Sequence, residues 1–231
     1  MATTGPSLPP TCIWFRSARP GLQAPSDSRP LEVFCVNILY PKLRLNLLRP
    51  MLGYAVMGAL IAGLYGVVHD QITYSISPEY FTRLKFFQFH YADFGLPPRY
   101  FVAEIGFLAT WWVGFIAGWF LARVAVPGAA PTIARSRCCR GFAVILACAL
   151  AASLVGFGLG VLRGPNADLS GWQEFASRRG IVDLPSFVRV AYIHNASYLG
   201  GLIGLVVALV DLHRGKKQVD KAGGRSPVPA L

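Results

Sequence analysis

Four long apolar segments constrain the fold of this chain more than any other feature. They cover residues 51–68, 100–126, 141–162 and 190–210, and the only Asp, Glu, Lys, Arg or His residues inside them are Glu104, Arg123 and His194. About 20 helical residues cross the hydrocarbon of a bilayer. The segments do not alternate polar and apolar residues, as the strands of a membrane barrel would. We therefore predict an all-α fold, a four-transmembrane-helix bundle.

The composition agrees with this class. Of 231 residues, 54% are hydrophobic and 14% are charged, against about 25% charged in soluble domains. The net charge of +11 could indicate nucleic acid, but the basic residues lie between the apolar segments, where membrane proteins carry them. The expected partner is the lipid bilayer, and no nucleic acid is expected.

Lysine and arginine set the predicted orientation. Segments 31–50, 123–140 and 211–231 hold twelve of them, and the longer segments 69–99 and 163–189 hold seven. Because cytoplasmic segments carry more Lys and Arg, both termini are expected in the cytoplasm, with the two long connections outside.

Three regions are expected along the chain. Residues 1–50 are rich in Pro, Ser and Ala and are expected to be a disordered extension, without the apolar core of a signal peptide. Met51 opens the first apolar segment, so two interpretations stay open: a natural start at Met51, or a genuine cytoplasmic extension. Residues 51–212 form the membrane domain, and residues 213–231 are expected to be a basic, disordered cytoplasmic tail.

The two halves of the membrane domain resemble each other at an offset of 88 residues, with twelve identities over residues 53–123. They include "GYAV" at 53–56 against "GFAV" at 141–144, and "LP" at both 96–97 and 184–185. This predicts two tandem helical hairpins, as in some transporters with parallel repeats. Shared apolar composition is the alternative explanation.

The connection after the first span carries a helix signal. Ser77, Pro78 and Glu79 suit a helix start, and Phe81, Leu84, Phe87 and Tyr91 then recur near helical spacing. We predict an amphipathic surface helix whose aromatic stripe faces the lipid. In the second connection, Asp168 or Ser170 is expected to cap a short helix that carries Trp172 and Phe175.

Several polar residues lie where the bilayer would disfavour them, all near the outer ends of the spans. Such groups usually face a partner or water. The predicted polar site consists of His69, Asp70, Glu79, His90, Glu104, His194 and Asn195.

Three interpretations of this site are open. His69, Glu104 and His194 could bind a metal, although their spacing matches no standard motif. Glu104 and His194 could form a titrating pair on a proton or ion route. The favoured interpretation is structural: Glu104 pairs with His194, Arg99 or Arg189 and fixes the helix register.

Other chemistry is not indicated. Cys12, Cys35, Cys138, Cys139 and Cys148 show no C-x-x-C spacing, and they are expected to be reduced. No nucleophile elbow, phosphate-binding loop or dinucleotide fingerprint is present, so we expect no cofactor and favour a protein that is not an enzyme.

The stretch "HDQITYSISPEYFTRLKFFQF" at 69–89, continued weakly by "GFLATWWVGF" at 106–115, resembles a motif of uncharacterised bacterial integral membrane proteins. The resemblance implies a location in the envelope of a bacterium, and we expect the inner membrane. The expected function is small-solute or ion handling at a polar outer vestibule. One alternative is a structural or assembly subunit, whose aromatic outer loop binds a second copy or another membrane protein. Another is a membrane enzyme that uses His69 and Asp70 as an acid–base pair.

Overall fold

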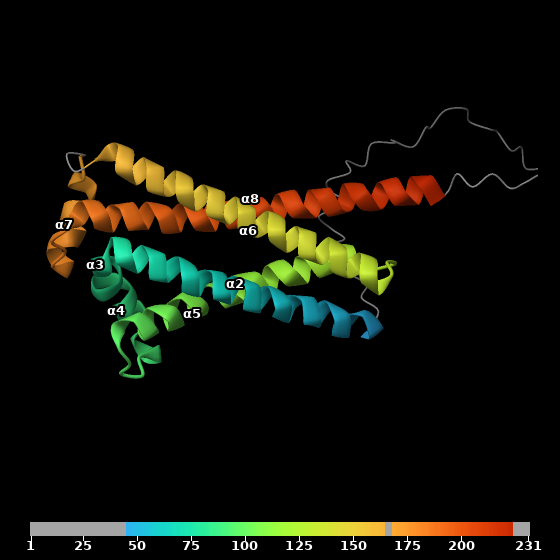
Figure 1. The fold of residues 1–231 in the computed structure, drawn as a ribbon, viewed down its shortest axis with the longest axis horizontal. Coiled ribbons are helices and arrows are strands. Elements are labelled where there is room, and N and C mark those ends of the chain that lie inside the picture. Colours follow the sequence, from blue (N-terminus) through green and yellow to red (C-terminus); the bar gives the residue numbers. More distant parts are fainter. Residues whose placement is uncertain (1–44, 165–167, 224–231) are drawn as a thin grey trace, which may run out of the picture. The chain divides into compact units, whose positions relative to one another are not determined.

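The computed structural model describes residues 45–164 and 168–223, and four long helices dominate this part of the chain (Figure 1). They are α2 (Leu48–Ile76), α5 (Pro98–Ala125), α6 (Pro131–Arg163) and α8 (Leu184–Gly223). Each contains a stretch long and apolar enough to cross a membrane. The prediction of an all-α bundle with four membrane-spanning helices is confirmed.

Short helices fill the connections. A single 3₁₀ turn (Leu45–Leu47) precedes α2. Between α2 and α5 lie α3 (Pro78–Tyr80), a π-helical turn (Phe81–Lys85), α4 (Phe86–Gln88) and a 3₁₀ turn (His90–Ala92), and α7 (Ser170–Arg179) lies between α6 and α8. Figure 1 shows α3, α4 and α7 at the same end of the four helices. We call this end the long-loop end.

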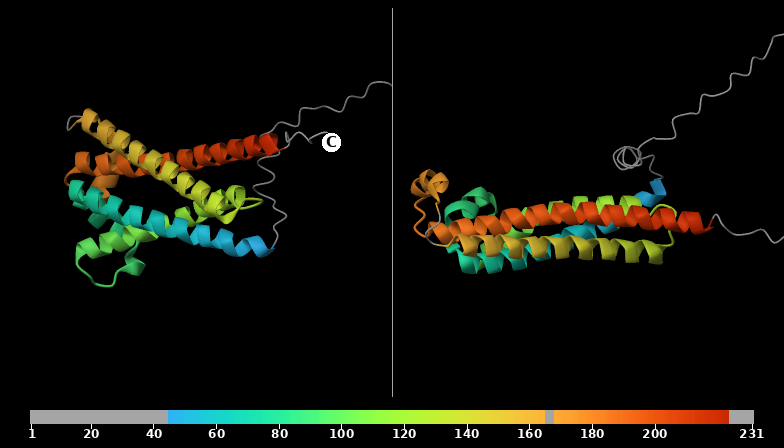
Figure 2. Two further views of the ribbon diagram at one scale, coloured as in Figure 1. Left: turned by 45° about the vertical axis from the view of Figure 1, so that its right-hand side comes forward. Right: turned by 90° about the horizontal axis from the view of Figure 1, so that it is seen from above.

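The four helices form two hairpins. The most extensive helix contacts join α2 to α5 and α6 to α8, and contacts between the two pairs are much sparser (Figure 2). Glycines lie at the crossings: a Cβ atom on Gly66 would collide with the carbonyl of Gly106, and one on Gly114 with the carbonyl of Gly58. Small residues let helices approach closely in lipid. The arrangement agrees with the two tandem hairpins predicted from the repeat.

Several helices extend beyond the apolar segments. The residues after 68, expected to form a connector, continue α2 to Ile76. Residues 45–50 are helical, and α8 reaches Gly223 through part of the tail predicted as disordered. Hydropathy detects only the part of a helix that lies in hydrocarbon, so it underestimates helices that continue into the polar interface. The predictions for residues 1–44 and 224–231 lie outside the described residues.

The prediction for the first connection was correct about the helix start and wrong about the stripe. A helix begins at Pro78 after Ser77, as expected. However, Phe81 is fully buried, and with Tyr80 it joins a cluster around Phe187 of α8, whereas Phe87 and Tyr91 are exposed. Helical spacing alone cannot distinguish a face that packs on protein from one that faces lipid. The π-helical turn also changes the register within the segment.

The second connection contains the predicted short helix, but its N-cap position is Leu169 and no side chain caps the helix there. The Asp168 carboxylate accepts the backbone N–H of Ser170 at 2.9 Å, which lowers the pKa of Asp168, and α7 begins at Ser170. Trp172 and Phe175 pack their rings against Phe187. The two connections therefore share one aromatic cluster.

Glu79 joins the first connection to α8. Its carboxylate oxygens accept the backbone N–H groups of Val182 and Asp183 at 2.8–3.1 Å, immediately before α8 begins. The free N–H groups and the dipole at a helix start favour a negative charge. Glu79 thus contributes to folding at the long-loop end. The three cysteines within the described residues, Cys138, Cys139 and Cys148, are free thiols.

Candidate metal centre

A polar stripe runs along α2 near the long-loop end. Tyr65, His69 and Thr73 follow each other at intervals of four residues, and Asp70 lies beside them. Residues spaced by three or four positions share one helix face. Hydrogen bonds and ring contacts connect this face to α8, where His194 and Ser197 occupy adjacent turns.

Three side chains of this region meet in the interior. Asp70 and His194 are 4% and 2% exposed, and His69 is half-buried. Nδ1 of His69 lies 3.2 Å from Oδ1 of Asp70, and Nε2 of His194 lies 3.9 Å from the same oxygen. One donor atom from each residue can be chosen so that all three lie within 4.8 Å of one another. We call these three residues the His–Asp–His cluster.

Thr73 orients His194. The Thr73 hydroxyl donates to the carbonyl of His69, one turn earlier in α2, with the oxygen and acceptor 3.1 Å apart. The Thr73 oxygen also lies 3.3 Å from Nε2 of His194, so the hydroxyl links the two helices at the cluster.

The cluster contains unused ligand atoms. Nε2 of His69 and Oδ2 of Asp70 are buried and have no hydrogen-bond partner among the described residues. Buried polar atoms are nearly always hydrogen-bonded, so two unpaired atoms in one cluster require an explanation. Both are atoms of the kind that divalent metal ions bind.

Aromatic rings close the cluster toward the long-loop end. The Tyr80 ring stacks on the imidazole of His194 with centroids 4.8 Å apart and an interplanar angle of 20°. The ring of Phe81 lies 6.1 Å from the same imidazole. Lys85, at the end of the π-helical turn, is also buried. The segment Pro78–Gln88 therefore covers the cluster.

Toward the opposite end one more layer of polar side-chain contacts follows the cluster. The Tyr65 hydroxyl lies 2.9 Å from the Ser197 oxygen and 3.4 Å from that of Ser153, so it joins α2, α6 and α8. Beyond it lies an apolar cluster of Leu121, Ala125, Cys138, Phe142, Ala208 and Leu212. The His–Asp–His cluster is thus a polar site in one half of the bundle.

The structure separates the other predicted site residues from this cluster. Glu104 makes no ion pair with His194, Arg99 or Arg189, and its buried Oε2 has no hydrogen-bond partner among the described residues. The favoured structural interpretation of Glu104 was therefore wrong, and Asp70 is the carboxylate nearest His194. Glu79 caps α8, His90 is exposed and contacts the Phe87 carbonyl, and Asn195 is exposed.

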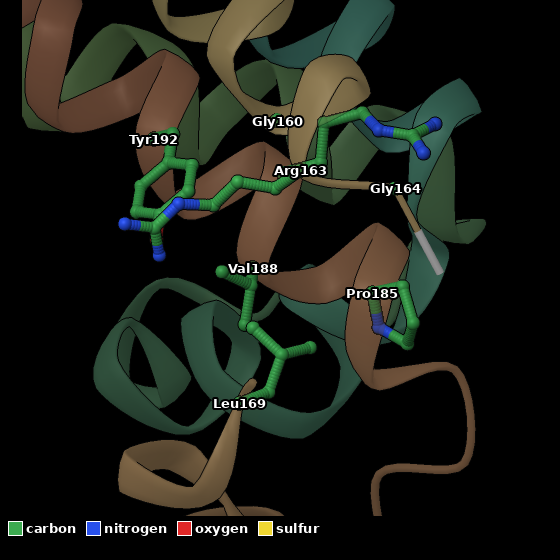
Figure 3. A pocket seen from close by; sticks show the side chains of 8 residues that line it. Gly160, Arg163, Gly164, Leu169, Pro185, Val188 and Tyr192 are labelled. Carbon is green, nitrogen blue, oxygen red and sulfur yellow. The ribbon is translucent and has the colours of Figure 1, made fainter. Parts of the chain in front are cut away.

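A separate pocket lies between the ends of α6 and α8 (Figure 3), lined by residues that include Arg163, Arg189 and Tyr192. Arg163 donates to the Tyr192 hydroxyl at 2.7 Å and lies over its ring. None of the three residues of the His–Asp–His cluster lines this pocket.

Three residues that contribute to this region were not among the predicted site residues: Tyr65, Thr73 and Tyr80. The spacing of four residues from His69 could have indicated Tyr65 and Thr73, since both then share its helix face. No sequence signal indicated that Tyr80 would turn inward, because this depends on how the connection folds back onto α8.

Two imidazoles and one carboxylate form a donor set that binds zinc, ferrous iron and related ions. In a tetrahedral site with ligand bonds of about 2.1 Å, the donors lie about 3.4 Å apart. The separations in the cluster run from 3.2 Å to at most 4.8 Å, so the more distant donors would have to approach each other for one ion to bind all three.

Fold and site together define a multi-pass membrane protein with a buried His–Asp–His cluster in one half of its helix bundle. No protein-family model matches this chain, and comparison with curated proteins and with solved structures gives no match either. The geometry of the cluster is therefore the basis for inferring a function.

Proposed function

We propose that this protein binds a divalent transition-metal ion through His69, Asp70 and His194, as an inner-membrane protein of a bacterium with both termini in the cytoplasm. The observation that carries the proposal is the convergence of three buried donor residues with two unpaired ligand atoms. In this orientation the site lies in the outer half of the membrane. The proposal is more specific than the small-solute or ion handling expected from the sequence, because it names a metal ion as the bound species.

The charge of the cluster favours a cation. A buried carboxylate needs compensation from a positive charge or several hydrogen bonds. Asp70 contacts only one histidine within hydrogen-bond distance, and its second oxygen has no partner among the described residues. A metal ion would compensate the carboxylate and use the free nitrogen of His69. The apolar cluster around Phe142 offers no polar groups to a passing ion. We therefore favour a binding site that the ion enters from the long-loop end, and not a continuous path for ions through the bundle.

Metal analysis tests this function. Protein purified in detergent, stripped with a chelator and dialysed against Zn²⁺ should retain one zinc ion per chain. His194→Gln should weaken the affinity by about 100-fold, because it removes a ligand and not only a supporting contact.

His90→Gln is the matched control. His90 lies on the exposed connection, outside the cluster, so its replacement should leave zinc binding unchanged. Equal losses in both variants would mean that zinc binds to surface histidines, and a wild-type protein without zinc affinity would refute the proposed function.

The orientation has its own test. In intact cells, a membrane-impermeant thiol reagent should label cysteines introduced at Gln88 and Gln173, in the two long connections. It should not label the exposed native Cys139, at the opposite end of the bundle, until the membrane is permeabilised. Labelling of Cys139 in intact cells would reverse the proposed orientation.

A further inference from the structure

Two arginines line the pocket between the ends of α6 and α8. Arg163 is the last residue of α6, and Arg189 lies in the second turn of α8. No carboxylate lines the pocket, and neither arginine forms an ion pair with a carboxylate within residues 45–164 and 168–223. The pocket therefore carries two positive charges that the described part of the chain does not balance.

Tyr192 orients the guanidinium group of Arg163. Its hydroxyl accepts a hydrogen bond from Arg163 at 2.7 Å, and the guanidinium carbon lies 5.5 Å from the centre of the tyrosine ring (Figure 3). A guanidinium group has five N–H donors, so this contact leaves others for a ligand. Because Tyr192 is neutral, it fixes the direction of Arg163 without compensating its charge.

Arg189 carries a buried donor without an acceptor. Its Nε is buried and has no hydrogen-bond partner in the part of the chain that the structure describes. The stem of Arg189 packs on Gly160, which also lines the pocket, and a Cβ on Gly160 would lie 2.6 Å from Cγ of Arg189. Buried polar atoms are nearly always hydrogen-bonded. The free donor therefore indicates a ligand that brings an acceptor into the pocket.

The location of the pocket indicates the chemistry of that ligand. α6 and α8 are both candidate membrane spans, and the two arginines lie near the ends of these spans at the long-loop end. Lipid phosphate groups lie just outside the hydrocarbon, and basic pockets between membrane helices bind anionic headgroups. The planar donor pairs of arginine also match the oxygens of a phosphate group.

We propose that Arg163 and Arg189 bind a phosphate group in this pocket, carried by the headgroup of an anionic phospholipid or by free phosphate. The two guanidinium groups supply the charge and the donors. Tyr192 holds the first of them, and Gly160 leaves room for the second. The site is separate from the His–Asp–His cluster, so this inference goes beyond the proposed metal binding and does not depend on it.

Native mass spectrometry of chelator-treated protein in detergent tests the site. One molecule of phosphatidylglycerol should bind per chain, more tightly than phosphatidylcholine with the same acyl chains. Arg163→Gln combined with Arg189→Gln should weaken phosphatidylglycerol binding by about tenfold or more, because the charged hydrogen bonds to the phosphate are lost. The control combines Arg83→Gln with Arg178→Gln. It removes the same charge from exposed positions in the two connections and should leave the affinity near the wild-type value.

Thermal unfolding distinguishes the two sources of phosphate. A melting temperature of the wild type that rises with phosphatidylglycerol and not with millimolar inorganic phosphate identifies a lipid site, and a rise with both identifies a site that free phosphate can fill. In either case the rise should disappear when both pocket arginines are replaced.

The proposal would be overturned if neither compound raised the melting temperature, or if the two lipids bound equally well. Equal phosphatidylglycerol binding by the wild type and the pocket variant, or equal losses in the pocket and control variants, would also overturn it. Arg163 is exposed, so Arg163→Gln alone should fold even if the double replacement does not. That single variant should also bind phosphatidylglycerol more weakly than the wild type.

Discussion

Replacing Gly66 with leucine is expected to separate α2 from α5 and to abolish zinc binding at the same time. A Cβ atom at this position would collide with the backbone carbonyl of Gly106, which cannot rotate away as a side chain could. Overpacking in protein interiors costs about 1–3 kcal/mol, and a rigid backbone neighbour places this change at the upper end or beyond. Gly66 also precedes His69 by less than one turn, so a displaced α2 moves two ligands. Thermal unfolding and zinc titration in detergent measure the two effects.

Gly201→Leu is the control for this change. Gly201 belongs to α8, and no atom lies within 4 Å of a Cβ built on it. A leucine there should leave both melting temperature and zinc affinity near the wild-type values. The close-packed hairpin would be contradicted if the two variants behaved alike.

Removal of the Phe81 ring is expected to have the next largest effect. Phe81 is fully buried and contacts Tyr74, Tyr80 and His194 through its ring. Truncation of a buried phenylalanine to alanine usually costs about 3–5 kcal/mol. Phe81→Ala should therefore lower the melting temperature strongly and loosen the segment Pro78–Gln88 over the His–Asp–His cluster.

Phe94→Ala is the control for Phe81→Ala, because it removes the same apolar ring from an exposed position. Phe94 belongs to the same connection but is 76% exposed, so its truncation should change the free energy of unfolding by less than about 0.5 kcal/mol. The same two variants should be compared in lipid bilayers. If Phe94→Ala lowered the free energy of unfolding as much as Phe81→Ala, the connection would be held by the membrane, as the predicted lipid-facing stripe implied.

The sequence was sufficient for the four spans because lipid imposes a strong and simple condition. A segment inside the bilayer must consist predominantly of apolar residues, and its backbone must be hydrogen-bonded within its own helix. The ends of the helices were less predictable. His69 to Ile76 are polar enough for the interface and are still helical, so hydropathy placed the end of α2 too early.

The sequence also named the three residues of the His–Asp–His cluster, because each is polar at a position where lipid would be expected. It chose the wrong carboxylate for His194. Glu104 and Asp70 were both placed near the same end, and depth alone cannot decide between them. The choice depends on the rotation of α2 and α5 about their axes, which is set by the glycine contacts at Gly58, Gly66, Gly106 and Gly114.

The three residues of the His–Asp–His cluster are divided between the two hairpins, and this has a mechanical consequence. His69 and Asp70 belong to the α2–α5 hairpin, and His194 belongs to the α6–α8 hairpin. Each hairpin is internally close-packed, and the contacts between the two hairpins are sparse. We therefore expect the hairpins of the described bundle to tilt relative to each other more easily than either one deforms. An ion held by all three residues would link the two hairpins directly. Binding of the ion would then restrict the relative motion of the two hairpins along the whole length of the helices, and its release would restore that motion.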